Sequence, residues 1–177
     1  MYIWLGINVD GQLSDLRGRA EEIEKGLGVK NSCYTLPMHI SLKISFPVSD
    51  ELFDSIVNDV AGIYSSHQPF DVDVKGIENE SVIVWIRMKE NEKLNAIHDE
   101  LNELLLRKYG VPLHEYDMDY KFHTTLFMDS DTDKMHAAYD TIKNEPVPKI
   151  LRADRFIIGT SPSGALGTYS VYKEIKI

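Results

Sequence analysis

The chain has 177 residues, a formal net charge of −9 at pH 7, 43% hydrophobic residues and 27% charged residues. This length and composition suit one well-cored domain, residues 1–177, and give no indication of disorder. The acidic balance argues against a surface that holds long nucleic acid through its phosphates, because that mode of binding needs basic patches. A small phosphorylated ligand, or an RNA end in a locally basic cleft, stays compatible with it.

The N-terminal segment MYIWLGINVDGQ favours a cytoplasmic protein. It is apolar for only about eight residues and has no basic leader, so we expect a strand over Tyr2 to Val9 and no signal peptide. No window approaches the roughly 20 apolar residues of a membrane span. The single cysteine, Cys33, cannot form an intramolecular disulfide, and no zinc-ligand cluster is visible. We therefore expect no membrane partner, no metal site and no cofactor.

After the first strand, helices and strands are expected to alternate. Apolar residues at helical spacing predict a helix from Leu13 to about Gly28. The run PMHISLKISF predicts a strand over Pro37 to Phe46, and a helix from the N-cap Ser49 to about Tyr64 follows it. Phe70 to Ile77 and Ser81 to Met88 are expected to be strands. The polar residues Glu78, Asn79 and Glu80 between them predict the turn of a hairpin.

The second half of the chain repeats this order. A helix is predicted over Asn91 to Tyr109, with Gly110 and Pro112 as stop signals. A strand over Tyr120 to Met128 and a helix from about Thr132 to Lys143 come next, and the segments KILRADRFIIGTSP and YSVYKEIKI are expected to form a final pair of strands. Helix, strand, helix and two strands thus occur twice, which predicts a duplicated, two-lobed α+β fold.

Each repeat carries a histidine followed two residues later by a hydroxyl residue and then by leucine. The tetrapeptides are HISL, with His39 and Ser41, and HTTL, with His123 and Thr125. Alternation along a strand places each histidine and its hydroxyl residue on one face, and the same rule places Lys43 on the face of His39. The shared context makes a common site for the two motifs more credible than two unrelated strand histidines.

Two imidazoles and two hydroxyls suit the opening of a phosphodiester. One imidazole can remove a proton from the nucleophile and the other can protonate the departing oxygen, since their ordinary pKa of about 6.5 allows both roles near neutral pH. Ser41 and Thr125 are roughly 6 to 7 Å along the strand from their histidines, within reach of non-bridging oxygens of the same phosphate. Lys43 could add positive charge to the cleft or be a solvated strand lysine, and no metal is required.

These paired motifs resemble those of the 2H phosphoesterase superfamily, which includes RNA 2',3'-cyclic phosphodiesterases and 2'-5' RNA ligases. The resemblance implies a pseudo-symmetric α+β fold, with two lobes of mainly antiparallel sheet, helices packed outside and a central cleft. It implies a hydrolase acting on a 2',3'-cyclic nucleotide, an RNA end or a 2'-5' linkage, with Tyr34 and Tyr169 as candidate substrate contacts. The sequence does not determine which histidine is the acid; we favour His39 as the acid and His123 as the base.

Other interpretations stay open at this point. A two-lobed module that binds a phosphorylated, nucleotide-like ligand without turnover would also use such residues. If both motifs were ordinary strand residues, the histidines would lie far apart. Arg87 is either a phosphate contact or a surface charge, and His98 is expected to be a solvated or edge residue of its helix. The acidic residues ahead of the second motif are expected to form a polar loop without a metal.

Overall fold

Two antiparallel sheets of four strands form the framework of the computed structural model, which describes residues 1–29 and 36–177. The first sheet has the strand order β2-β1-β7-β8 and the second has the order β5-β4-β3-β6. The strands of the first sheet are β1 (Tyr2–Asn8), β2 (His39–Pro47), β7 (Arg155–Ser161) and β8 (Ser170–Lys176). Those of the second are β3 (Phe70–Glu80), β4 (Ile83–Met88), β5 (His123–Met128) and β6 (Ile150–Ala153).

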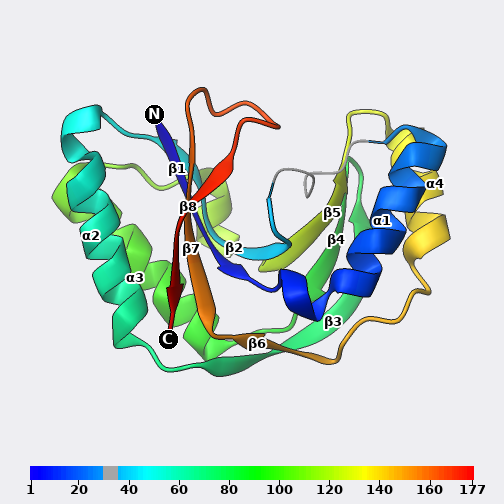
Figure 1. The fold of residues 1–177 in the computed structure, drawn as a ribbon, viewed down its shortest axis with the longest axis horizontal. Coiled ribbons are helices and arrows are strands. Elements are labelled where there is room, and N and C mark those ends of the chain that lie inside the picture. The colour runs from blue at the N-terminus through cyan, green and yellow to red at the C-terminus, as the bar shows by residue number, and fades with distance from the viewer. Residues whose placement is uncertain (30–35) are drawn as a thin grey trace.

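Helices cover one side of each sheet and so define two lobes (Figure 1). In the first lobe, α2 (Asp50–Ser66) and α3 (Glu92–Tyr109) pack together, with contacts to β8 and β2. In the second lobe, α1 (Ser14–Leu27) and α4 (Thr132–Ile142) pack together on β3, β4 and β5. Short 3-10 turns follow β1 and α3, namely η1 (Asp10–Gln12) and η2 (Glu115–Asp119). The two-lobed α+β fold expected from the sequence is confirmed.

The lobes do not coincide with the two halves of the sequence. Helix α1 comes directly before β2 in the chain but packs on the second sheet, and α3 comes directly before β5 but packs on the first sheet. The chain therefore crosses between lobes before each histidine strand, as Figure 1 shows for α1 and α3. Each lobe is built from elements of both repeats.

The segment KILRADRFIIGTSP, expected as one strand, forms two strands in different sheets. Strand β6 pairs with β3 in the second sheet, and β7 pairs with β1 in the first, with a break at Asp154. At about 3.3 Å per residue, one strand of this length would span roughly 45 Å and overrun either sheet. The expected hairpin with YSVYKEIKI is present as β7 and β8.

The β3–β4 hairpin is also longer than the sequence pattern indicated. The three residues assigned to the turn lie within β3 and pair with β4, and the turn falls at Ser81 and Val82. Ser81 adopts a φ of 55°, the left-handed conformation that a two-residue hairpin turn requires. The three polar residues have the composition of a turn, which explains the wrong prediction, but they continue the strand.

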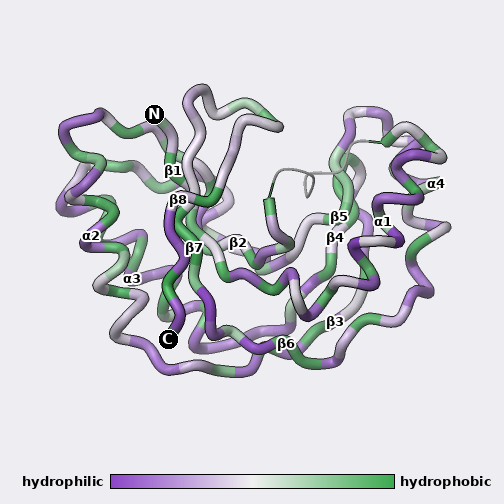
Figure 2. The backbone as a smooth tube through the Cα atoms, in the orientation of Figure 1, coloured by the Kyte–Doolittle hydropathy of each residue, from purple (hydrophilic) through white to green (hydrophobic). Residues whose placement is uncertain are grey.

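Apolar side chains from both lobes join in one contiguous core beneath the helices. On β1, Ile3, Leu5 and Ile7 are fully buried on the helix-covered face, so the opposite face carries the residues that alternate with them. Figure 2 shows hydrophobic residues alternating with hydrophilic ones along the covering helices, as expected for helices with one face on a sheet. No helix in the described part of the chain has the length and apolar character needed to cross a membrane.

Candidate active site

The two histidine motifs meet at the boundary between the lobes. His39 is the first residue of β2 and His123 is the first residue of β5, and these two strands contact each other (Figure 1). The histidines are close enough that positive charge on His39 lowers the pKa of His123. This proximity contradicts the interpretation of two separate, ordinary strand histidines.

Each imidazole is held by the same backbone contact. Nδ1 of His39 lies 2.8 Å from the carbonyl oxygen of Pro37, and Nδ1 of His123 lies 2.6 Å from the carbonyl oxygen of Lys121. A carbonyl oxygen can only accept, so Nδ1 carries the hydrogen in both rings. In the neutral histidines, the lone pair is therefore on Nε2, the atom left to meet a substrate.

The environment of both rings favours the uncharged form. Burial lowers the pKa of His39, partly opposed by its bond to the Pro37 carbonyl. Burial is also the main cause that lowers the pKa of His123 to about 4, and the charges of His39 and Arg87 lower it further. The Lys121 carbonyl and the charge of Glu80 act in the opposite direction. At neutral pH, free His123 is thus a proton acceptor.

The hydroxyl residues of the motifs share the histidine side of the sheets. Ser41 is paired across the ladder with Gly6, and Thr125 is paired with Trp85. The Tyr120 hydroxyl interacts with Ser41, and burial followed by the charge of Asp117 raises the pKa of Tyr120. Tyr120 is thus an uncharged neighbour of Ser41 that sequence analysis did not identify. It lies in the segment that connects η2 to β5.

A β-bulge follows the hydroxyl residue in both motifs. Between Gly6 and Leu5 on β1, β2 advances by two residues, from Ser41 to Lys43, and β5 makes the same extra step from Thr125 to Phe127 against β4. In such a bulge, two successive residues of one strand oppose a single residue of the other, and both point to the same face as that residue. Simple alternation beyond the hydroxyl is therefore lost in each strand.

This bulge corrects the predicted position of Lys43. The side chain pairs with Leu5 on the helix-covered face, is 2% exposed and forms an ion pair with Asp117 of η2. Lys43 therefore does not share the face of His39 and is not open to a substrate phosphate. The equivalent residue of the second lobe, Phe127, is fully buried in the core.

His98 belongs to the same buried polar group as Lys43. It is 3% exposed, and its Nδ1 lies 2.7 Å from the carbonyl oxygen of Leu42, the bulge residue of β2. Asn102 Nδ2 lies 3.0 Å from Nε2 of the same ring. The expectation of a solvated His98 was wrong. Its spacing from Leu94, Leu101 and the rest of the apolar stripe on α3 could have placed it in the interior.

The two candidate tyrosines have different outcomes. Tyr34 lies outside the described residues. The Tyr169 hydroxyl lies 2.8 Å from Oγ of Ser45 and 2.9 Å from the carbonyl oxygen of Gly164, which ties the β7–β8 loop to β2. Substrate contact by either tyrosine stays a prediction.

Sequence analysis missed two tryptophans that pack against the histidines. The ring centroids of Trp4 and His39 are 4.4 Å apart, and those of Trp85 and His123 are 4.3 Å apart, with interplanar angles of 40° and 38°. Glycines gave a signal for Trp4, because Gly6 and Gly159 interrupt strands and a glycine there often marks a close approach. Nothing in the spacing of Trp85 distinguishes it from a core residue.

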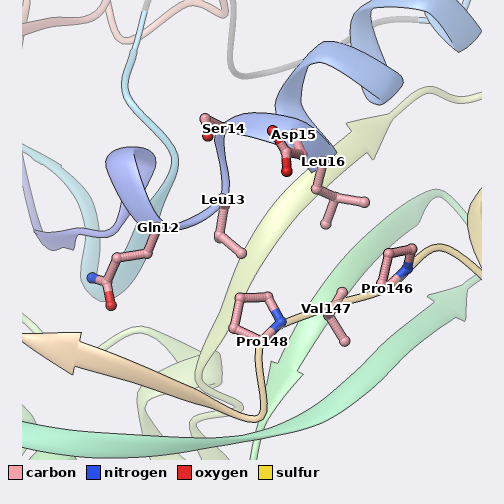
Figure 3. A pocket seen from close by; sticks show the side chains of 8 residues that line it. All are labelled: Gln12, Leu13, Ser14, Asp15, Leu16, Pro146, Val147 and Pro148. Atoms are coloured by element: carbon pink, nitrogen blue, oxygen red, sulfur yellow. The ribbon is translucent and has the colours of Figure 1, made fainter.

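One pocket of the described chain lies apart from both histidine motifs. A pocket between α1 and the segment before β6 contains neither motif, and Figure 3 shows Leu13 and the two prolines facing its interior. Its lining consists of Gln12, Leu13, Ser14, Asp15, Leu16, Pro146, Val147 and Pro148. In residues 1–29 and 36–177, no three His, Cys, Asp or Glu side chains are grouped to hold a metal ion.

Comparisons with known proteins agree with this geometry. The family model of the 2'-5' RNA ligase superfamily matches residues 3–161. A Shouchella clausii (strain KSM-K16) protein named as a phosphoesterase, ABC1741, is 29% identical over 70 residues, which cover 38% of this chain and 41% of that protein. The match thus spans less than half of that relative.

Solved structures of similar fold cover nearly the whole chain. E. coli LigT in its apo form has a TM-score of 0.62 at 16% identity, covering 99% of this chain and 96% of LigT. The protein TT0787 of Thermus thermophilus has a TM-score of 0.59 at 16% identity, covering 99% of this chain and 97% of the other. LigT has also been crystallised with 3'-AMP and with NADP+. At these identities, the likeness concerns the fold.

Proposed function

The chain belongs to the 2'-5' RNA ligase superfamily, and this membership supports a phosphoesterase-type enzyme. We propose that the protein is a metal-independent phosphodiesterase. The substrate would be a nucleoside 2',3'-cyclic phosphate, an RNA end with such a group, or a 2'-5' linkage. The observation that carries the proposal is the pair of imidazoles, one from each lobe, each with its Nδ1–H on a backbone carbonyl. Both Nε2 atoms are then available for proton transfer to a single phosphodiester.

The surroundings of the histidines suggest different roles for them. His123 is paired across the ladder with Arg87, whose charge helps to keep the imidazole neutral, so we assign it as the general base. His39 is paired with Asn8, which carries no charge, and we assign it as the general acid. A bound phosphodiester is an anion, and its charge would favour protonation of the acid partner. In the reverse, ligation-like direction, the two roles would exchange.

Ser41 and Thr125 complete the proposed site. Their hydroxyls would donate to the non-bridging oxygens, which gain negative charge in the transition state. Lys43 has no part in this scheme, because its ammonium group is buried against Asp117. Arg87 is a positive charge beside His123 in this scheme: it is 16% exposed, donates to the carbonyl oxygen of Phe122 and forms an ion pair of 3.7 Å with Glu78.

The choice of a nucleotide substrate rests on the relatives and on charge. LigT, which shares the fold, is found in complexes with 3'-AMP and NADP+. The net charge of −9 disfavours long nucleic acid held by its phosphates. A nucleotide or the terminus of an RNA is therefore the substrate class that we propose.

The test is hydrolysis in the presence of EDTA. The panel contains nucleoside 2',3'-cyclic phosphates, 2'-5' and 3'-5' dinucleotides, and ADP-ribose 1'',2''-cyclic phosphate. We expect turnover by the wild type that is lost in His39→Ala and in His123→Ala. His136→Ala is the matched control, because it removes an exposed histidine from α4 and should leave turnover unchanged.

Two outcomes would contradict the proposal. Turnover that EDTA abolishes would contradict a metal-independent reaction. Binding of panel members without any turnover would support the alternative of a module that holds a phosphorylated ligand. A binding measurement on the same panel, by calorimetry, separates the second outcome from an inactive preparation.

A further inference from the structure

Both tryptophans of the chain are buried on the histidine side of the sheets rather than in the core. Trp4 is 5% exposed and Trp85 is 7% exposed, yet neither is part of the contiguous apolar core. Within the described residues, both indole Nε1 atoms are buried without a hydrogen-bond partner. An unsatisfied buried donor costs about 1–3 kcal/mol. Phenylalanine would fill space without this cost, so packing alone does not explain two indoles here.

The two indoles reach the same place from different backbone positions. Trp85 is paired directly with Thr125, the motif hydroxyl residue of the second lobe. In the first lobe, the residue paired with Ser41 is Gly6, and the indole comes from Trp4, two residues earlier on β1. A simple duplication would place both tryptophans at equivalent positions. Both lobes thus have an indole ring against the imidazole, but the tryptophan lies at a different strand position in each lobe.

Two glycines make the arrangement in the first lobe possible. Trp4 is paired across the ladder with Gly159, and a Cβ atom there would lie 1.9 Å from Nε1 of the indole. A Cβ atom on Gly6 would lie 3.1 Å from Cζ3 of Trp4 and 3.4 Å from Cδ2 of His39. The indole therefore lies across both glycines to reach the imidazole, and any larger side chain at Gly159 must displace it.

We propose that Trp4 and Trp85 are positioning residues, whose indoles fix the ring planes of His39 and His123 and shield one side of each imidazole from water. The Nδ1–H bond to the backbone carbonyl sets the tautomer but leaves the ring free to turn about that bond. Contact with the indole removes this freedom and directs Nε2 toward the phosphodiester. The inference rests on the proposed function for its catalytic part, whereas the placement of the rings does not depend on it.

The indoles are not the only groups that affect the titration of the imidazoles. His123 also faces Arg87 on β4, Glu80 on β3 and His39 on β2, with the Lys121 carbonyl on Nδ1. His39 faces His123 across the lobe boundary and has the Pro37 carbonyl on Nδ1. None of these groups changes when a tryptophan is replaced. A shift in the titration of the neighbouring histidine would then report the loss of shielding by the indole.

The experiment replaces each tryptophan by leucine and by phenylalanine. Trp85→Leu should raise the pKa of His123 from about 4 toward its ordinary value, and Trp4→Leu should raise that of His39. Turnover should fall mainly in kcat, by about 100-fold if the imidazole moves by about 1 Å. The phenylalanine variants should restore part of both properties. NMR titration of the histidine ring protons measures the pKa without any turnover.

Gly159→Ala displaces the indole of Trp4 without replacing it, and provides a second, independent variant. It should change the titration of His39 and leave that of His123 much less affected. Phe156→Leu is the matched control: Phe156 lies on β7, in the same sheet as Trp4, but its ring packs on Tyr64 of α2, at 4.5 Å between centroids, on the helix-covered face. The control should lower stability without changing either histidine pKa.

The outcomes separate the inference from the proposed function. Wild-type titrations of both histidines in folded Trp85→Leu, Trp4→Leu and Gly159→Ala proteins would overturn the inference. A further outcome is that the variants show changed histidine titrations while the wild type turns over no member of the panel. This outcome would support the placement of the rings and count against the proposed function alone. If a leucine variant does not fold, the phenylalanine variant and Gly159→Ala decide the question.

Discussion

The two lobes have the same geometry around the histidine but build it with different residues. Each motif has the Nδ1–H bond, the indole contact and the bulge after the hydroxyl residue. The residues next to these shared features differ. Asn8 is paired with His39 where Arg87 is paired with His123, and the residue directly after the bulge residue is Lys43 in the first lobe and Phe127 in the second. The placement of the imidazole ring is thus common to both lobes, whereas the charged residues beside it differ between them.

The largest expected effect tests the assignment of acid and base. His39→Ala and His123→Ala should each lower kcat/KM for a cyclic phosphate by about 10²–10⁴-fold, the usual contribution of a general acid or base. An aryl diester such as bis(4-nitrophenyl) phosphate releases a leaving group that needs no protonation. On this substrate His39→Ala should lose little activity and His123→Ala most of it. Equal losses on both substrates would contradict the assignment.

The second prediction concerns the buried ion pair between Lys43 and Asp117. Lys43→Met leaves Asp117 buried without its partner and should lower the free energy of unfolding by about 3–5 kcal/mol, as for other broken buried pairs. The double variant Lys43→Met/Asp117→Leu should recover most of this loss, which denaturant unfolding would measure. A double variant as unstable as the single one would show that the pair is not the cause.

The motif hydroxyls should give an intermediate effect that is equal in the two lobes. A hydrogen bond to a charged group contributes about 1.5–3 kcal/mol, so Ser41→Ala and Thr125→Ala should each lower kcat/KM by roughly 10- to 100-fold. Ser41→Thr keeps the hydroxyl and should stay close to the wild type. A loss confined to one lobe in steady-state kinetics would show that only one hydroxyl contacts the phosphate.

The smallest expected effect is a shift in pH dependence. Arg87→Met removes a positive charge that lowers the pKa of His123, so this pKa should rise from about 4. The acidic limb of the kcat/KM profile, below which the base is protonated, should move to higher pH by less than about one unit, since burial is the main cause of the shift. Arg107→Met is the control, because it removes an exposed positive charge from α3 that is not among the charges shifting the pKa of His123. An unmoved limb would argue against His123 as the base.

The sequence was informative where a pattern is local. Helical spacing and stop signals predicted the helices, and Ser49 and Asp131 are N-cap residues of α2 and α4. The matching tetrapeptides predicted that His39 and His123 would come together, and the strands that begin with them, β2 and β5, are in contact. Their role as a catalytic pair stays a prediction.

What the sequence did not reveal depends on pairing between distant strands. The bulge that directs Lys43 into the interior arises from the register of β2 against β1, and alternation within one strand does not show it. The division of the last long strand at Asp154 follows from the limited length of the strands in each sheet. The contact of the Trp4 indole with His39 depends on a glycine on the neighbouring strand, Gly159, which leaves room for the indole.

The crossing of helices between the lobes has a consequence for folding. Because α1 and α3 each pack on the lobe that does not contain the strand following them, neither half of the chain can cover its own sheet alone. We expect the protein to unfold in one cooperative transition, with slow amide exchange in both lobes lost together. A fragment cut between β4 and α3 should remain unfolded, and mixing the two fragments should restore the native spectrum. His39 and His123 would then come together only after both lobes have folded.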